Sequence, residues 1–153
     1  MTAYIRRLRV AVWFLVVMVL VLSCLLVAKG IEKDANQTAL LLASNSIVER
    51  ANYYKQQWLL HNNPDELKLQ GNRVKYSKNG WVVPNLSGDQ VDCQRWFTIL
   101  YPQQHVYGDL PSRIVDNSYG STFKCEYLFS PNMHLTIGLK DKKFEVGVGF
   151  TSG

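Results

Sequence analysis

An uncharged apolar run, Val10–Ala28, constrains the fold of this chain more than any other feature of its sequence. The run is 19 residues long, and Ser23 is its one clearly polar residue. A helix of that length rises about 28 Å, close to the roughly 30 Å thickness of the hydrocarbon core of a bilayer. Its Val, Leu and Phe residues each favour insertion by about 0.3–0.6 kcal/mol near the helix centre. The sequence therefore predicts one transmembrane helix over residues 10–28.

Basic residues next to the run predict its orientation. Arg6, Arg7 and Arg9 come directly before it, whereas the two lysines that follow it are interleaved with acidic residues. Cytoplasmic flanks of membrane helices are enriched in Lys and Arg. In a bacterium, residues 1–9 are then a basic cytoplasmic tail, and residues 29–153 lie in the periplasm, attached to the inner membrane by a single pass.

Two other interpretations of the apolar run remain open. Ala28-Lys29-Gly30 resembles a signal-peptide cleavage site, although the apolar region of a signal peptide is usually only 7–15 residues long. Val21–Cys24 loosely resembles a bacterial lipobox, in which Cys24 would carry the lipid. The run continues past Cys24 through four more apolar residues, where a lipoprotein normally becomes polar. An uncleaved anchor accounts best for the length of the run.

A second helical pattern follows the membrane segment, over residues 29–63. Apolar residues recur there at spacings of three and four, which places them on one face of a helix. Asn62-Asn63-Pro64 ends the pattern, because proline cannot continue a helix. The side chains predicted to pack under a sheet are those of Leu40, Ile47, Tyr54 and Trp58.

The remaining residues, 64–153, have the texture of a small β-rich domain. Apolar residues alternate with polar ones in Ser121–Phe129, Met133–Leu139 and Phe144–Phe150. Such alternation is typical of antiparallel strands with one buried face. The apolar face of the preceding helix is the natural cover for that sheet, so the sequence predicts an α+β domain.

Shorter elements are predicted before this meander. Asn79-Gly80 is a strong hairpin signal between Arg73–Tyr76 and Trp81–Val83. A short helix is expected to end before Pro102. A weaker strand pattern lies at Arg113–Val115.

Two cysteines in the β-rich part, Cys93 and Cys125, are predicted to form a disulfide. The bond would close a loop of about 32 residues and add about 3–4 kcal/mol of stability in the chain-entropy model. Disulfides persist outside the cytoplasm, which agrees with the predicted topology. Two buried free thiols are the alternative.

Neither composition nor motifs point to catalysis, a metal or a cofactor. His61, His105 and His134 have no partner at helical spacing, and no C-x-x-C, G-x-S-x-G or phosphate-binding loop is present. Without the three N-terminal arginines, 14 basic residues face 12 acidic ones, too even a balance for a nucleic-acid surface. The sequence predicts a protein that is not an enzyme.

Aromatic residues are numerous enough to suggest one further possibility, a platform for carbohydrate. Their spacing on the predicted helix and strands favours a role in the core instead. The residues concerned are Tyr53, Tyr54, Trp58, Trp81 and Trp96.

The layout resembles that of type IV pilins, in which a long N-terminal helix lies half in the membrane and half under an antiparallel sheet, with a disulfide near the C-terminus. More specifically, Ala51–Leu60, Gly80–Pro84 and Asp92–Trp96 resemble the F proteins of mannose-sensitive haemagglutinin (MSHA) pilus biogenesis. The resemblance implies a pilin-like α+β fold. It also implies the inner membrane and other pilin-like or pilus assembly proteins as partners.

One departure from the pilin pattern bears on the role of the chain. A prepilin carries a processing site and a glutamate five residues into the apolar segment, whereas Val10–Ala28 contains no acidic residue. We therefore expect a non-catalytic accessory protein of pilus biogenesis, which acts through protein contacts, in preference to a filament subunit. A periplasmic or surface ligand-binding or adhesive module is the alternative. The oligomeric state stays open.

Overall fold

The computed structural model describes residues 2–85 and 90–150, with side chains of the first helix described over residues 5–27 and 37–60. The chain forms two compact units, Met1–Asn36 and Gln37–Gly153. Helix α1 (Thr2–Leu60) contributes to both units. From Gln37 on, the predicted amphipathic helix thus belongs to the same unit as the strands.

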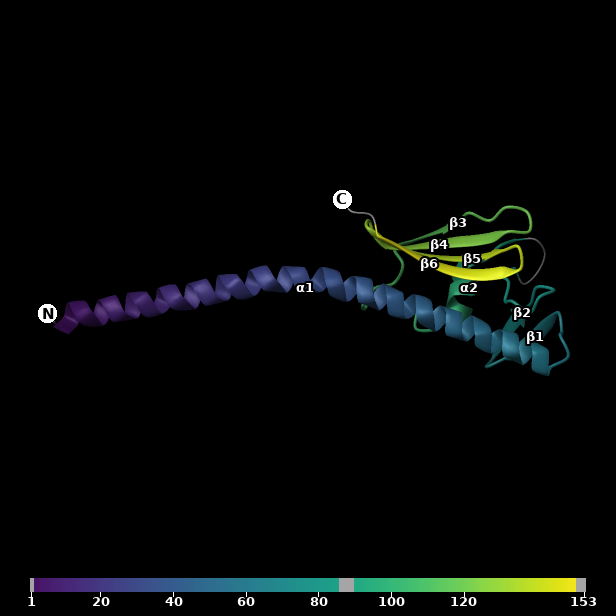
Figure 1. Ribbon diagram of the computed structural model, residues 1–153, viewed down its shortest axis with the longest axis horizontal. Coiled ribbons are helices and arrows are strands. Elements are labelled where there is room, and N and C mark those ends of the chain that lie inside the picture. Colours follow the sequence, from purple (N-terminus) through teal and green to yellow (C-terminus); the bar gives the residue numbers. More distant parts are fainter. Residues whose placement is uncertain (1, 86–89, 151–153) are drawn as a thin grey trace. The chain divides into compact units, whose positions relative to one another are not determined.

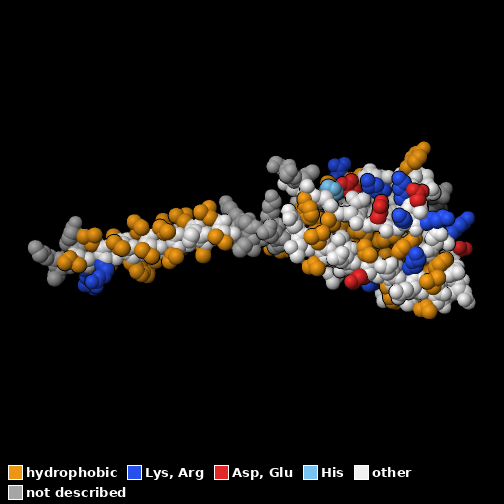
Figure 2. All heavy atoms as spheres, in the orientation of Figure 1, with side chains coloured by type: hydrophobic (Ala, Val, Ile, Leu, Met, Phe, Trp, Pro, Cys, Tyr) orange, Lys and Arg blue, Asp and Glu red, His pale blue; other side chains and the backbone are white. Residues whose placement is uncertain are grey.

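In the N-terminal unit, one segment of α1 is long and apolar enough to cross a membrane. It is Ile5–Val27, and none of it is buried within the protein. Figure 2 shows hydrophobic side chains covering the visible side of this part of the helix. Arg6, Arg7 and Arg9 lie at its beginning. A helix of this composition is stable in the apolar interior of a bilayer, because all its backbone hydrogen bonds are made within the segment.

In the second unit, α1 provides one wall of the hydrophobic core. Leu40, Ile47 and Tyr54 have no solvent exposure, whereas Asn52 and Gln56 on the other side are exposed. Ordinary helical periodicity accounts for this division between the two faces. Helix α1 is thus the packing helix that the sequence predicts.

Trp58 is partly buried: it packs against the core and contacts the turn at Gly80. Gly80 has a φ of +79°, and a Cβ there would collide with the Trp58 ring. Glycine is required at this position for both reasons: it tolerates the left-handed backbone and leaves room for the indole.

The first two strands form a hairpin of their own, which differs from the prediction. Strand β1 (Glu66–Leu69) pairs with β2 (Asn72–Lys75). Gln70 and Gly71, with φ of 50° and 82°, form the turn between them. At Asn79-Gly80 the predicted hairpin is present but short: Tyr76 and Val82 form a bridge, and backbone N–H groups of Ser77 and Val83 donate to the carbonyls of Trp81 (2.8 Å) and Lys75 (3.0 Å). A two-residue turn with both φ values positive matches the twist of paired strands, which explains why β2 pairs with β1.

The larger sheet has four antiparallel strands in the order β3-β4-β5-β6 (Figure 1). The three-strand meander predicted from alternation is confirmed, and β3 joins it at one edge. Cys125, Tyr127, Leu135 and Ile137 on its inner face have no exposure. The strand bounds are Arg113–Asp116 for β3, Phe123–Ser130 for β4, Met133–Lys140 for β5 and Lys143–Phe150 for β6.

A short helix, α2 (Cys93–Leu100), completes the core. The Phe97 ring stacks on that of Tyr127 in β4, with 4.5 Å between the ring centroids. Trp96 donates a hydrogen bond from Nε1 to the Val82 carbonyl, 3.1 Å away. Helices packed against an antiparallel sheet make an α+β domain, and with the long N-terminal helix the arrangement is compatible with a pilin-like fold.

The packing of α1 predicts different effects for two adjacent residues. Ile47→Ala removes a fully buried side chain and should lower the free energy of unfolding by about 2–5 kcal/mol. Val48→Ala, at a position that is 39% exposed, should change it by about 0.5 kcal/mol or less. Thermal unfolding of the full-length protein in detergent measures both. Equal effects would mean that this face of α1 does not pack in the core.

Candidate functional site

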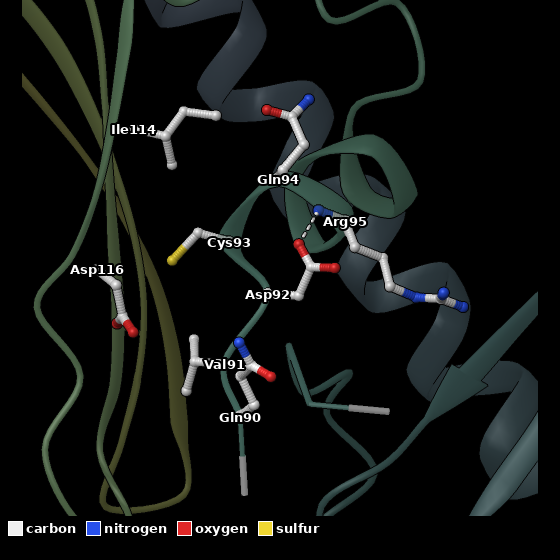
Figure 3. Close-up of a pocket in the computed structure, with 8 residues that line it drawn as sticks. All are labelled: Gln90, Val91, Asp92, Cys93, Gln94, Arg95, Ile114 and Asp116. Carbon is white, nitrogen blue, oxygen red and sulfur yellow. Dashed lines mark hydrogen bonds between the residues drawn. The ribbon is translucent and has the colours of Figure 1, made fainter. Parts of the chain in front are cut away.

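A polar cleft of about 560 Å³ lies at the beginning of α2 and is the candidate site (Figure 3). It separates the first residues of α2 from strand β3. Its lining residues are Gln90, Val91, Asp92, Cys93, Gln94, Arg95, Ile114 and Asp116. Four of the eight carry a side-chain amide or carboxylate, so the cleft offers hydrogen-bonding groups.

The start of α2 is fixed by its N-cap. Asp92 accepts a hydrogen bond from the backbone N–H of Arg95, 2.9 Å away. A carboxylate at this position satisfies an unpaired helical N–H and complements the positive end of the helix dipole. The guanidinium of Arg95 donates to the Arg73 carbonyl at 2.9 Å, and Figure 3 shows it directed away from Asp116. The main role of Asp92 is therefore structural: it caps α2 in the wall of the cleft.

A disulfide between Cys93 and Cys125 joins α2 to β4 behind the cleft, with 5.6 Å between the two Cα atoms. The Tyr127 hydroxyl donates a hydrogen bond of 2.8 Å to the Cys93 carbonyl. Burial raises the pKa of Tyr127, and the nearby carboxylates of Asp92 and Asp116 raise it further. This tyrosine stays protonated and serves as a buried donor.

Cys93, Asp116 and Cys125 bring three potential metal-ligand atoms within 4.8 Å of one another. They are the one such group among the residues described. Metal-binding cysteine acts as a thiolate, and both sulfurs are here bonded to each other. With the disulfide formed, the carboxylate of Asp116 is the one ligand that these three residues offer a cation.

The histidines singled out in the sequence are not brought together at the cleft. Ring nitrogens of His61 and His105 lie 2.7 and 2.6 Å from the carbonyls of residues 57 and 103. His134 lies 3.9 Å from Glu126 on the sheet. Each occupies a separate local environment, and the absence of catalysis stays a prediction.

The aromatic residues are used mainly in packing. Tyr54 and Trp96 have no exposure, so neither is available as a platform for carbohydrate. Trp81 stacks on Phe144, with 5.4 Å between the ring centroids, and donates from Nε1 to the Lys142 carbonyl at 3.0 Å. The Lys55 ammonium lies 4.0 Å from the centroid of the same indole. Trp81 thus joins α1, its own turn and the β5–β6 hairpin, a contact between distant segments that no local pattern predicts.

Comparisons of the chain with protein-family models, with curated proteins and with solved structures found no match. The candidate site combines a capped helix, a buried disulfide and hydrogen-bonding groups at the surface, features that suit binding.

The Cys93–Cys125 disulfide should stabilise the domain, whereas the free Cys24 should not. Cys125→Ser should lower the free energy of unfolding by about 2–5 kcal/mol, because it releases a constraint on the unfolded chain. Cys24→Ser, at an exposed position in the apolar segment of α1, is the matched control and should leave the unfolding temperature unchanged. If the two variants unfold alike, the disulfide does not stabilise the domain.

Proposed function

We propose that this chain is a single-pass, non-catalytic accessory protein of type IV (MSHA-like) pilus biogenesis, which acts through protein contacts. The observation that carries the proposal is the dual use of α1. One helix contains a segment able to cross a membrane, Ile5–Val27, and a face that builds the core of an α+β domain. Such a chain presents a folded domain at a membrane surface.

The domain offers surfaces for binding. The cleft beside α2 carries amides and carboxylates, and the outer face of the sheet is covered by neither helix. In this proposal these surfaces contact other pilin-like or pilus assembly proteins. The membrane segment associates with partners in the inner membrane.

The compartment follows from two features. A disulfide suits an oxidising compartment, which for a bacterial membrane protein is the periplasm. The arginines at positions 6, 7 and 9 favour a cytoplasmic N-terminus. We place the domain in the periplasm, attached to the inner membrane.

The link to pili rests on the resemblance of Ala51–Leu60, Gly80–Pro84 and Asp92–Trp96 to the MSHA F proteins, together with the pilin-like fold. The membrane segment lacks the acidic residue that filament subunits carry. An accessory role fits this combination better than incorporation in a filament.

A clean deletion of the gene tests the proposal directly. Surface pili should be lost or strongly reduced, and the wild-type gene should restore them. Electron microscopy and surface immunoblots of the pilin measure the effect. Normal piliation with altered binding to carbohydrate or surfaces would contradict the proposal and favour the ligand-binding module.

Topology has its own test. Alkaline phosphatase fused after Gly153 should be active, because the enzyme needs the oxidising periplasm to form its disulfides. A cytoplasmic reporter at the same place should be inactive. The opposite pair of results would reverse the topology, and processing that globomycin blocks would establish lipidation at Cys24.

A further inference from the structure

Strand β6 forms one edge of the four-stranded sheet, and it is long for an edge (Figure 1). It has eight residues, whereas β3 at the opposite edge has four. An edge strand presents a row of backbone N–H and C=O groups to which another chain can pair, and proteins commonly protect it by short length, proline or a covering segment. β6 is not short and contains no proline. In the part of the chain that the structure describes, β5 is the one strand paired with it.

The β5–β6 turn determines which backbone groups of β6 face away from β5. Asp141 and Lys142, with φ of 48° and 70°, form a two-residue turn, and Lys140 and Lys143 are the pair that closes it. The closing pair of such a turn is hydrogen-bonded. Hydrogen-bonded and non-hydrogen-bonded pairs then alternate along antiparallel strands. The outward N–H and C=O groups of β6 are therefore those at positions 144, 146, 148 and 150.

No neighbouring segment within residues 2–85 and 90–150 takes the place of a fifth strand. The hydrogen bonds of turns, loops and caps between described backbone groups include none from residues 143–150. Exposure agrees with this, because Gly147 and Phe150 are exposed and Val146 and Val148 are partly exposed. The outward backbone groups of β6 are thus open to solvent or to a partner.

Gly147, in the middle of β6, is not required by the fold. Its φ is not positive, and a Cβ there would meet the Thr136 Cβ at 4.0 Å, an ordinary contact. Gly149 differs, because the His134 ring occupies the space that its Cβ would need. Glycine weakens a strand, and within one it often marks a place where another backbone approaches closely. Gly147 therefore indicates that a further chain approaches β6 here.

The side chains at the outward positions are apolar and only partly covered. Phe144, Val146 and Val148 pack against the core and stay partly exposed, and Phe150 is 39% exposed. An added strand would place every second side chain beside these residues. Apolar side chains there would remove the remaining apolar surface from water. The chemistry of the edge thus favours an extended segment with apolar residues at alternate positions.

We propose that β6 binds an extended segment of a partner protein, which adds to the sheet as a further strand. The inference rests on the proposed function only in taking the partner to be a different protein. Backbone hydrogen bonds along the edge supply affinity, and alternate side chains supply specificity. The segment carries a large side chain opposite Gly147, where the space is open. A second copy of β6 is a poorer match, because its outer face offers Lys143, Glu145 and two glycines.

Photo-cross-linking on native membranes tests strand addition by its register. Lys143, Glu145 or Gly147, three exposed residues on the outer face of β6, is replaced by p-benzoylphenylalanine. The three positions should link to residues two apart on one segment of one partner, as identified by mass spectrometry of the linked peptides. Arg113, exposed on the opposite edge strand, is the control position and should not link to that segment.

Three results of this experiment would overturn the proposal. They are no links from β6, links scattered without a step of two residues, and links to lipid. Links to β6 of another copy would also overturn it, in favour of self-association through the same edge.

A proline variant separates the backbone bonds from the side chain. Val148→Pro removes an outward N–H and leaves the ladder with β5, and proline is tolerated at such edge positions. Val148→Ala, the matched control, shortens the side chain and keeps the N–H. Links from position 145 should fall about tenfold or more in Val148→Pro and stay near the wild-type level in Val148→Ala. Equal yields in the two variants would contradict pairing through the backbone.

Hydrogen exchange keeps the test valid if the proline variant does not fold. The probe is a synthetic peptide that copies the linked segment, added to the full-length wild-type protein in detergent. The outward amides of Val146 and Val148 should exchange about tenfold more slowly or less with the peptide, whereas those of Glu145 and Gly147 already face β5 and should change little. Slowing of neither pair, or of all four amides alike, would contradict strand addition.

Piliation keeps this inference distinct from the proposed function. If deletion abolishes pili while β6 gives no links and Val148→Pro has normal pili, strand binding at β6 is wrong and the proposed function stands. If deletion leaves pili intact while the links persist in register, strand binding stands and the pilus role is wrong.

Discussion

The packing of one face of α1 against the sheet is the interaction on which the domain depends. Leu40, Ile47 and Tyr54 are fully buried in a core that also includes residues of β4 and β5. Burying such side chains gains about 1.5–3 kcal/mol each, before the entropy of ordering the chain is counted. The same helix carries the segment suited to a bilayer. Core formation and the capacity to span a membrane are therefore properties of one element.

Three covalent or polar contacts hold the other elements on this core. The disulfide ties α2 to β4, and the Tyr127 hydroxyl satisfies the Cys93 carbonyl beside it. Trp81 joins α1 to the β5–β6 hairpin. Each contact links segments distant in sequence, which compensates for the modest size of the core. The cleft beside α2 is thereby bounded by elements that these contacts hold in place.

Periodicity predicted most of the fold, because strong alternation and helical spacing directly reflect burial. The spacing of Leu40, Ile47 and Tyr54 gave the buried face of α1, and alternation gave β4, β5 and β6. Pairing across turns was harder: the Asn79-Gly80 signal gave a short hairpin, whereas the pairing of β2 with β1 across the Gln70-Gly71 turn had no comparable signal. The cleft could not be predicted, since residues from α2 and β3 meet there only through tertiary packing.

Hydrogen exchange of the full-length protein in detergent tests the central claim, that the second half of α1 is part of the domain core. Amides of residues 40–58 should exchange as slowly as those of β4 and β5, because opening them requires unfolding of the whole domain. Amides beyond the core, at the exposed turn of residues 107–110, should exchange much faster. Rapid exchange over residues 40–58 with a protected sheet would contradict the account and indicate a free helix attached to a separate β domain.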